Sequence, residues 1–117
     1  MSFSLIVPIA ANKKEYKKQI PEEFLFTQEG LMRCVRAIMG IDLTIFSHIY
    51  FTILRKHSER YFLKELLETQ FKRLGLEKAM VVELEHHTYS QPATVYETIK
   101  LVGISGCFMV KDADCYL

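Results

Sequence analysis

Four short runs of apolar, β-branched and aromatic residues alternate with longer amphipathic stretches, and this alternation constrains the fold most strongly. The first run, SLIVPIA, is almost continuously apolar, as expected for a parallel strand covered on both faces. In the stretch that follows, Cys34, Val35 and Ile38 share one face of a helix. We expect strands at residues 4–10, 47–54, 78–85 and 106–112, and helices at residues 27–40, 59–75 and 92–103.

The order β-α-β-α-β-α-β predicts a three-layer α/β/α fold around a doubly wound, mainly parallel sheet. Right-handed crossovers favour the strand order 3-2-1-4. In sheets of this kind, ligands bind beyond the carboxyl ends of the strands, where the strand order reverses. That position lies between the first and fourth strands. The length of 117 residues predicts a single domain over residues 1–117.

Three residues mark expected helix ends. Ser58 is placed to cap the helix at 59–75, because a serine hydroxyl can accept a hydrogen bond from the first turn. Gly75 is a typical stop signal for that helix. Pro92 fits the first position of the last helix, where its missing N–H leaves no hydrogen bond unmade.

Composition excludes several classes of protein. The net charge of +1 generates no global field toward nucleic acid or an anionic membrane. Each apolar run is much shorter than the roughly 20 residues of a spanning helix. The three cysteines, Cys34, Cys107 and Cys115, are odd in number and form no C-x-x-C pair, which favours reduced thiols over disulfides. We therefore expect a cytoplasmic protein with neither a membrane span nor a nucleic-acid partner.

Two aspartates follow the last predicted strand. Asp112 and Asp114 occupy alternate positions, so in an extended chain their carboxylates point the same way. Two carboxylates held close together repel each other, and a hard cation such as Mg²⁺ prefers oxygen ligands. The pair therefore suggests a magnesium site. The alternative is a solvated strand end, where aspartate is common.

A lysine-rich segment follows the first predicted strand. Lys13, Lys14, Lys17 and Lys18 lie where a phosphate-binding loop would be, and lysine neutralises phosphate as a point charge. The segment contains no glycine, so a tight backbone cradle for phosphate is not expected. The alternative is a solvated lysine-rich face.

Several familiar motifs are absent from the sequence. It contains no G-x-G-x-x-G, no G-x-x-x-x-G-K-[ST] and no G-x-S-x-G. His86 and His87 are adjacent at a strand end and would point in opposite directions, so we interpret them as part of a polar loop.

Three segments together carry a resemblance to a known family. SLIVPIAA at the start, TYSQPATVYETI before the last helix and CFMVKDADCYL after it resemble the N-terminal half of sugar-phosphate nucleotidyltransferases, which have a Rossmann-like, glycosyltransferase-A-like fold. In that family the first segment leads into a phosphate-binding loop, and the second begins the helix that approaches the nucleotide. A strand like the third ends in the aspartate that holds Mg²⁺.

The resemblance implies roles for individual residues. Asp114 matches the metal-binding aspartate and is the implied catalytic residue, with Asp112 as its neighbour at the metal. Ser90 and Gln91 would contact the base or ribose of a nucleoside triphosphate, although Ser90 stands where the family has a glycine. The charge that neutralises phosphate would come from the lysine-rich segment, through Lys13, Lys14, Lys17 or Lys18. The implied reaction transfers a nucleotidyl group to a sugar phosphate.

Domains of this family are about twice as long, so we expect the chain to be a front half that carries the nucleotide-binding part of an incomplete fold. An exposed last strand would then favour self-association through the sheet edge. Two alternatives remain open. One is a fragment of a nucleotide-sugar glycosyltransferase, in which a D-x-D pair binds a metal and a diphosphate. The other is a noncatalytic α/β interaction module.

Overall fold

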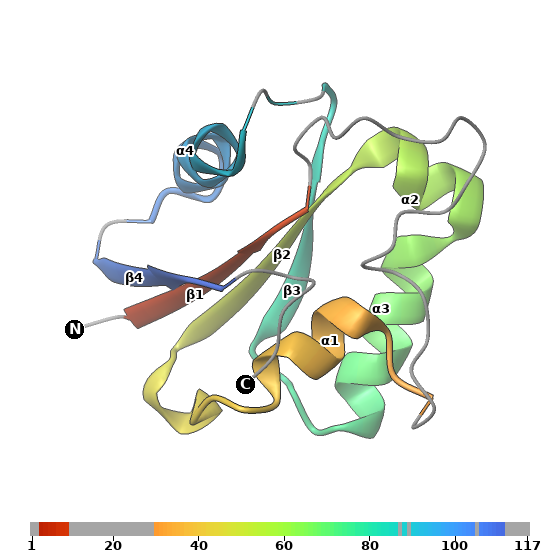
Figure 1. Cartoon of the computed structure of the whole chain (residues 1–117), viewed down its shortest axis with the longest axis vertical. Coiled ribbons are helices and arrows are strands. Elements are labelled where there is room, and N and C mark those ends of the chain that lie inside the picture. The colour runs from red at the N-terminus through yellow and green to blue at the C-terminus, as the bar shows by residue number, and fades with distance from the viewer. Residues whose placement is uncertain (1–2, 10–29, 87, 89, 105, 112–117) are drawn as a thin grey trace.

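A parallel sheet forms the centre of the molecule (Figure 1). The structure is a computed structural model that describes residues 3–9, 30–86, 88, 90–104 and 106–111. Within those residues, the sheet consists of β1 (Phe3–Pro8), β2 (His48–Leu54), β3 (Ala79–Leu84) and β4 (Cys107–Val110). All three strand pairings are parallel, and the order is β3-β2-β1-β4. The predicted fold class and strand order are therefore confirmed.

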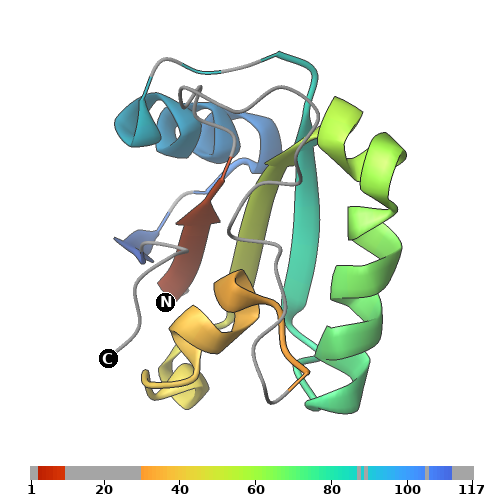
Figure 2. The same ribbon diagram turned by 45° about the vertical axis from the view of Figure 1, so that its right-hand side comes forward.

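Helices cover both faces of the sheet, which gives the three expected layers. The helical elements of the described residues are α1 (Arg33–Ile38), the 3₁₀ turn η2 (Leu43–Ile45), α2 (Arg55–Tyr61), α3 (Leu63–Arg73) and α4 (Gln91–Val102). The helices α1, α2 and α3 lie on one face, and α4 lies on the other (Figures 1 and 2). Within the described residues, no helix is both long enough and apolar enough to cross a lipid bilayer.

The larger core lies between the sheet and the layer formed by α1 and α3. Alternate residues of the strands point into it; Leu5 in β1 and Phe51 in β2 are fully buried. The ring of Phe51 packs against that of Phe71 in α3, with ring centroids 5.0 Å apart. Cys34 of α1 is buried in the same cluster, as its helical spacing predicted.

A smaller core joins the opposite face of the sheet to α4. Ile6, Tyr50 and Val82 contribute from the strands, and Val95 contributes from the helix. Because α4 is amphipathic and faces β1 and β2, its apolar residues reach the sheet while its outer face meets solvent. Gly103 ends the helix in the left-handed conformation, with φ of 72°.

The predicted helix at 59–75 is in fact two helices. The first, α2, begins at Arg55 directly after β2, and Ser58 is buried inside it, so the predicted cap at Ser58 was wrong. Phe62 then takes a left-handed conformation, with φ of 55°, and ends α2. For a residue with a side chain this conformation costs roughly 1–2 kcal/mol. The turn lets Leu63 and Leu67 become fully buried, which stabilises by about 1.5–3 kcal/mol each and outweighs that cost.

The approach to α1 is fixed by a buried side chain of α3. Gln70 accepts a hydrogen bond from the Met32 backbone N–H at 3.1 Å and donates one to the Gly30 carbonyl at 3.3 Å. Met32 is fully buried, so its N–H has no access to water and needs this partner. The helix α1 spans Arg33–Ile38, which is shorter than the predicted range 27–40. Residues 27–29 of that range lie outside the described residues.

Candidate functional site

The carboxyl ends of β1 and β4 lie side by side. Ile6 is in register with Val110, and the Lys111 backbone N–H donates to the Ile6 carbonyl at 3.1 Å. On the other side of β1, the Ile9 N–H donates to the Thr52 carbonyl at 2.8 Å. The chain first places β2 and β3 on one side of β1 and then places β4 on the other side. The strand order therefore reverses between β1 and β4. Crevices at such reversals are where open α/β sheets bind ligands.

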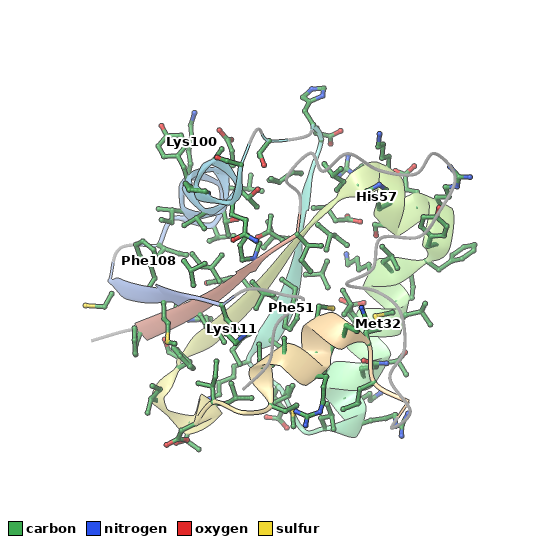
Figure 3. The ribbon with its side chains drawn as sticks, viewed as in Figure 1. Met32, Phe51, His57, Lys100, Phe108 and Lys111 are labelled. Atoms are coloured by element: carbon green, nitrogen blue, oxygen red, sulfur yellow. The ribbon has the colours of Figure 1, made fainter. Side chains whose placement is uncertain are left out.

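The segments with the strongest sequence signals continue from these two strand ends. Lys13, Lys14 and Lys17, and also Asp112 and Asp114, lie outside the described residues. The lysine-rich segment follows Ile9 in sequence, and Asp112 follows Lys111, whose backbone is hydrogen-bonded to β1. Figure 3 shows Lys111 at this end of β4. The proposed metal and phosphate contacts of those residues therefore stay predictions.

Ser90 and Gln91, which were expected to contact base or ribose, begin α4 at the same edge of the sheet. Ser90 is exposed and caps the helix, because its hydroxyl oxygen accepts a hydrogen bond from the Ala93 N–H at 3.3 Å. Gln91 is the first helical residue and is half-buried. Pro92 is therefore the second helical residue, one position later than expected. A contact between Ser90 or Gln91 and a nucleotide stays a prediction.

A chain of buried hydroxyl groups fastens the start of α4 to the sheet. The hydroxyls of Thr52 in β2 and Thr98 in α4 are 2.6 Å apart, and Thr98 also donates to the Thr94 carbonyl at 2.8 Å. The Thr88 and Thr94 hydroxyls are hydrogen-bonded to each other. The Ser90 carbonyl lies 3.1 Å from the Thr88 hydroxyl and 3.2 Å from the Thr94 hydroxyl, and it accepts a hydrogen bond from whichever of the two does not donate to the other. This network holds the capped end of α4 at the carboxyl edge of the sheet.

A pocket of about 840 Å³ opens between the carboxyl end of β3 and α4. It is lined by a mixture of charged, polar and apolar residues: Arg55, Glu83, Leu84, Glu85, His86, Thr88, Ala93, Glu97, Lys100 and Leu101. Figure 3 shows Lys100 on the outer side of α4. The pocket lies on the β3 side of the sheet, whereas the reversal of strand order is on the other side of β1.

The charges around this pocket are balanced and partly paired. Arg55, the first residue of α2, forms an ion pair with Glu85, which directly follows β3, and the two side chains are 49% and 62% exposed. Such an exposed pair is well screened by water. Among the residues that the structure describes, no group of three or more histidine, cysteine, aspartate or glutamate side chains is arranged to hold a metal. The pocket therefore offers mixed charge without a metal centre of its own.

The clearest electrostatic perturbation lies away from the candidate site. Asp42 caps η2, before β2 begins. Hydrogen bonds from the hydroxyl and then the backbone N–H of Thr44 stabilise the charged carboxylate and lower the pKa of Asp42 below its ordinary value. Lys78 also contributes to this lowering, and its ammonium group donates to the carbonyls of Leu43 and Phe46, which ties η2 to the start of β3.

Sequence reasoning missed the threonine network and the pocket. Thr94 and Thr98 are four residues apart on the apolar face of α4, and Thr52 lies among apolar residues in β2. Hydroxyls at buried positions need partners, so this placement was an available signal. The pocket had no such signal: all of its lining residues except Arg55 lie within residues 83–101, but no residue pattern in that stretch indicates a cavity.

Comparisons with known proteins add no family to this description. No protein-family model matches the chain, and a search of curated proteins found no match. The fold and the site geometry are therefore the basis for a functional proposal.

Proposed function

We propose that the chain binds a nucleoside triphosphate with Mg²⁺ beside the ends of β1 and β4 and serves the transfer of a nucleotidyl group to a sugar phosphate. One observation carries this proposal. β1 and β4 end side by side, in register at Ile6 and Val110, and these are the strands after which the lysine-rich segment and the aspartate pair follow in sequence. A phosphate-neutralising segment and a cation-binding pair would thus leave the sheet from adjacent strands.

The donor set suits the chemistry. In this proposal Asp114 and Asp112 hold the cation, because carboxylate oxygens are the ligands that Mg²⁺ prefers. When bound, Mg²⁺ would supply charge neutralisation on the phosphates. Lys13, Lys14 and Lys17 would neutralise phosphate as well. The chain would bind the nucleotide while a sugar phosphate attacks the α-phosphorus and pyrophosphate leaves, and it would supply the nucleotide-binding half of the enzyme.

The start of α4 would complete the nucleotide site. Ser90 and Gln91 lie at the carboxyl edge, and the threonine network immobilises them there. An immobilised first turn can select a base or ribose without first losing conformational entropy. The small number of cysteines, with no C-x-x-C pair in the sequence, supports a cytoplasmic location for this activity.

Isothermal titration calorimetry tests the proposal directly. We expect binding of at least one nucleoside triphosphate that requires Mg²⁺ and weakens at least tenfold in Asp114→Asn. Asp42→Asn is a matched control, because it removes a carboxylate near the amino end of β2, away from the proposed site, and should leave binding unchanged. Absence of binding for all common nucleoside triphosphates with Mg²⁺ would refute the proposal.

The same titration separates the related alternative. If nucleotide sugars bind with a divalent cation and nucleoside triphosphates do not, the D-x-D pair serves a glycosyltransferase instead. If neither class binds, and Asp114→Asn leaves stability unchanged, the noncatalytic interaction module is the better description.

A further inference from the structure

The strand β4 forms one edge of the sheet and is apolar on both of its faces. All four of its residues are exposed; Phe108, Met109 and Val110 retain 44%, 38% and 39% of their accessible surface. Phe108 is in register with Ser4 and therefore lies on the face of the sheet that α4 covers, as Figure 3 shows. Met109 is in register with Leu5 and lies on the opposite face. An exposed apolar edge strand is a template for pairing with another strand.

The outward hydrogen-bonding groups of β4 can be identified from its pairing with β1. The Lys111 N–H points toward β1, where it donates to the Ile6 carbonyl. In a strand the N–H and C=O of one residue point to the same side, and successive residues alternate. The backbone groups of Met109 therefore also face β1, and those of Phe108 and Val110 face away from the sheet. Among the described residues, no strand pairs with β4 on that side.

The opposite edge of the sheet is protected against such pairing. The edge strand β3 contains Glu83, and Lys78 and Glu85 flank it directly. Charged residues on an edge strand oppose the approach of another strand. Residues 107–110 carry no charge, so the two edges of the same sheet differ in this respect.

We propose that β4 pairs with β4 of a second copy of this chain, antiparallel, so that the two sheets join into one about a two-fold axis perpendicular to the sheet. Such an axis keeps each face continuous, so only residues that point to the same face can lie opposite each other. Phe108 lies opposite Val110 of the second copy, and Met109 lies opposite Met109. The pairing uses the outward N–H and C=O groups of Phe108 and Val110 in both copies.

Two features favour a second copy in this register. Of the two neighbouring registers that the axis allows, one would pair Val110 with Gly106, which lies outside the strand and has no side chain to pack, and the other would pair Met109 with the charged Lys111, beyond the strand end. In the proposed register Lys111 falls opposite Cys107 of the second copy, so no like charges face each other across the axis. The interface is self-complementary, which is what a two-fold contact requires. This proposal does not depend on nucleotide binding.

The dimer is expected to be weak, because a four-residue strand makes an interface smaller than those of permanent dimers. Sedimentation equilibrium of the whole chain, over a concentration range reaching several hundred micromolar, should show a reversible monomer–dimer equilibrium. Met109→Lys should weaken dimerisation at least tenfold, because two lysines would then face each other across the axis. Met80→Lys is the matched control: Met80 is 46% exposed on the β3 edge, and its replacement should leave dimerisation unchanged.

Disulfide trapping tests the register and detects even a weak dimer. Residues opposite each other at Met109 form a pair without hydrogen bonds between them, with Cα atoms about 4.5 Å apart, within the range for a disulfide. A variant with Met109→Cys, Cys107→Ser and Cys115→Ser should form an interchain disulfide with oxidised glutathione. A variant with Cys115→Ser alone keeps Cys107. The two Cys107 residues would be separated by roughly 14 Å along the strands, so no bridge is expected there.

The results of the sedimentation and trapping experiments either support the antiparallel β4 dimer or contradict it. A dimer that Met109→Lys disrupts and a cysteine at position 109 traps supports the proposal. Equal trapping at positions 107 and 109, disruption by Met80→Lys but not by Met109→Lys, or a monomer at every concentration without trapping would overturn it. Circular dichroism spectra matching the unmodified chain verify that each variant is folded.

Discussion

The hydroxyls of Thr52 and Thr98 join β2 to α4, and removing one or the other should lower the free energy of unfolding by different amounts. Thr52 and Thr98 are both fully buried, and their hydroxyl oxygens are 2.6 Å apart. A threonine hydroxyl has one hydrogen, and Thr98 uses its own to bond the Thr94 carbonyl. Thr52 is therefore the donor to Thr98. Replacing either residue with valine removes the hydroxyl while keeping the shape of the side chain.

The two single replacements should differ in cost. Thr98→Val leaves the Thr52 hydroxyl hydrogen buried without an acceptor, which costs about 1–3 kcal/mol in free energy of unfolding. Thr52→Val leaves Thr98 with its own bond to the helix, so only the net value of one hydrogen bond is lost, about 0.5–1.5 kcal/mol. Removing both hydroxyls leaves no stranded donor. The double variant should therefore be more stable than the sum of the two single effects predicts, by about 1–2 kcal/mol.

Urea unfolding followed by far-ultraviolet circular dichroism measures all four free energies. Thr69→Val is the matched control, because the exposed Thr69 hydroxyl bonds the Glu65 carbonyl on the helix surface, and its loss should change stability by less than about 0.5 kcal/mol. If the two single effects add to within about 0.5 kcal/mol in the double variant, the hydroxyls are not coupled and the assignment of Thr52 as donor is refuted.

Three further predictions concern other contacts. Gln70→Met should lower the free energy of unfolding by about 2–3 kcal/mol in the same urea assay, because the buried Met32 N–H loses its acceptor; an effect below 0.5 kcal/mol would contradict this. The contribution of Asp42 to stability, which results from its lowered pKa, should be fully present above its ordinary value of 3.8 and lost as the pH falls through the lower folded-state pKa. Asp42→Asn should therefore reduce the acid dependence of thermal unfolding, and equal acid dependence in both proteins would argue against the hydrogen-bond cause. Replacing Arg55 with Gln should cost less than about 1 kcal/mol, because Arg55 and Glu85 are both about half exposed, and thermal unfolding at low and high salt measures it.

The architecture was predictable because the apolar runs locate the strands and the right-handed crossovers restrict the order in which those strands lie in the sheet. The predicted first strand, residues 4–10, corresponds to Phe3–Pro8, and the predicted order agrees with the observed sheet. The break at Phe62 was not predictable from local signals, because phenylalanine rarely adopts a left-handed conformation. It depends on burial of Leu63 and Leu67 against the sheet, a tertiary effect.

The candidate site was predictable only in part. Strand order located the reversal between β1 and β4, and the start of α4 at Gln91 agrees with the predicted helix to within one residue. The threonine network needed knowledge of which strand residue faces which helix residue. The roles of Asp112 and Asp114 depend on residues outside the described part of the chain, so they remain predictions that the titrations address.

The unequal covering of the two faces has a consequence for local opening. Within the described residues, one face is covered by α1, α2 and α3, and the other by α4, whose core cluster is the smaller one. Amide protons of α4 should therefore exchange with solvent through a partial opening that leaves the strands protected, at a lower free energy than global unfolding. Since the start of α4 borders the proposed nucleotide site, ligand binding there would slow the exchange of α4 and connect occupancy of the site to the helix that covers the smaller core.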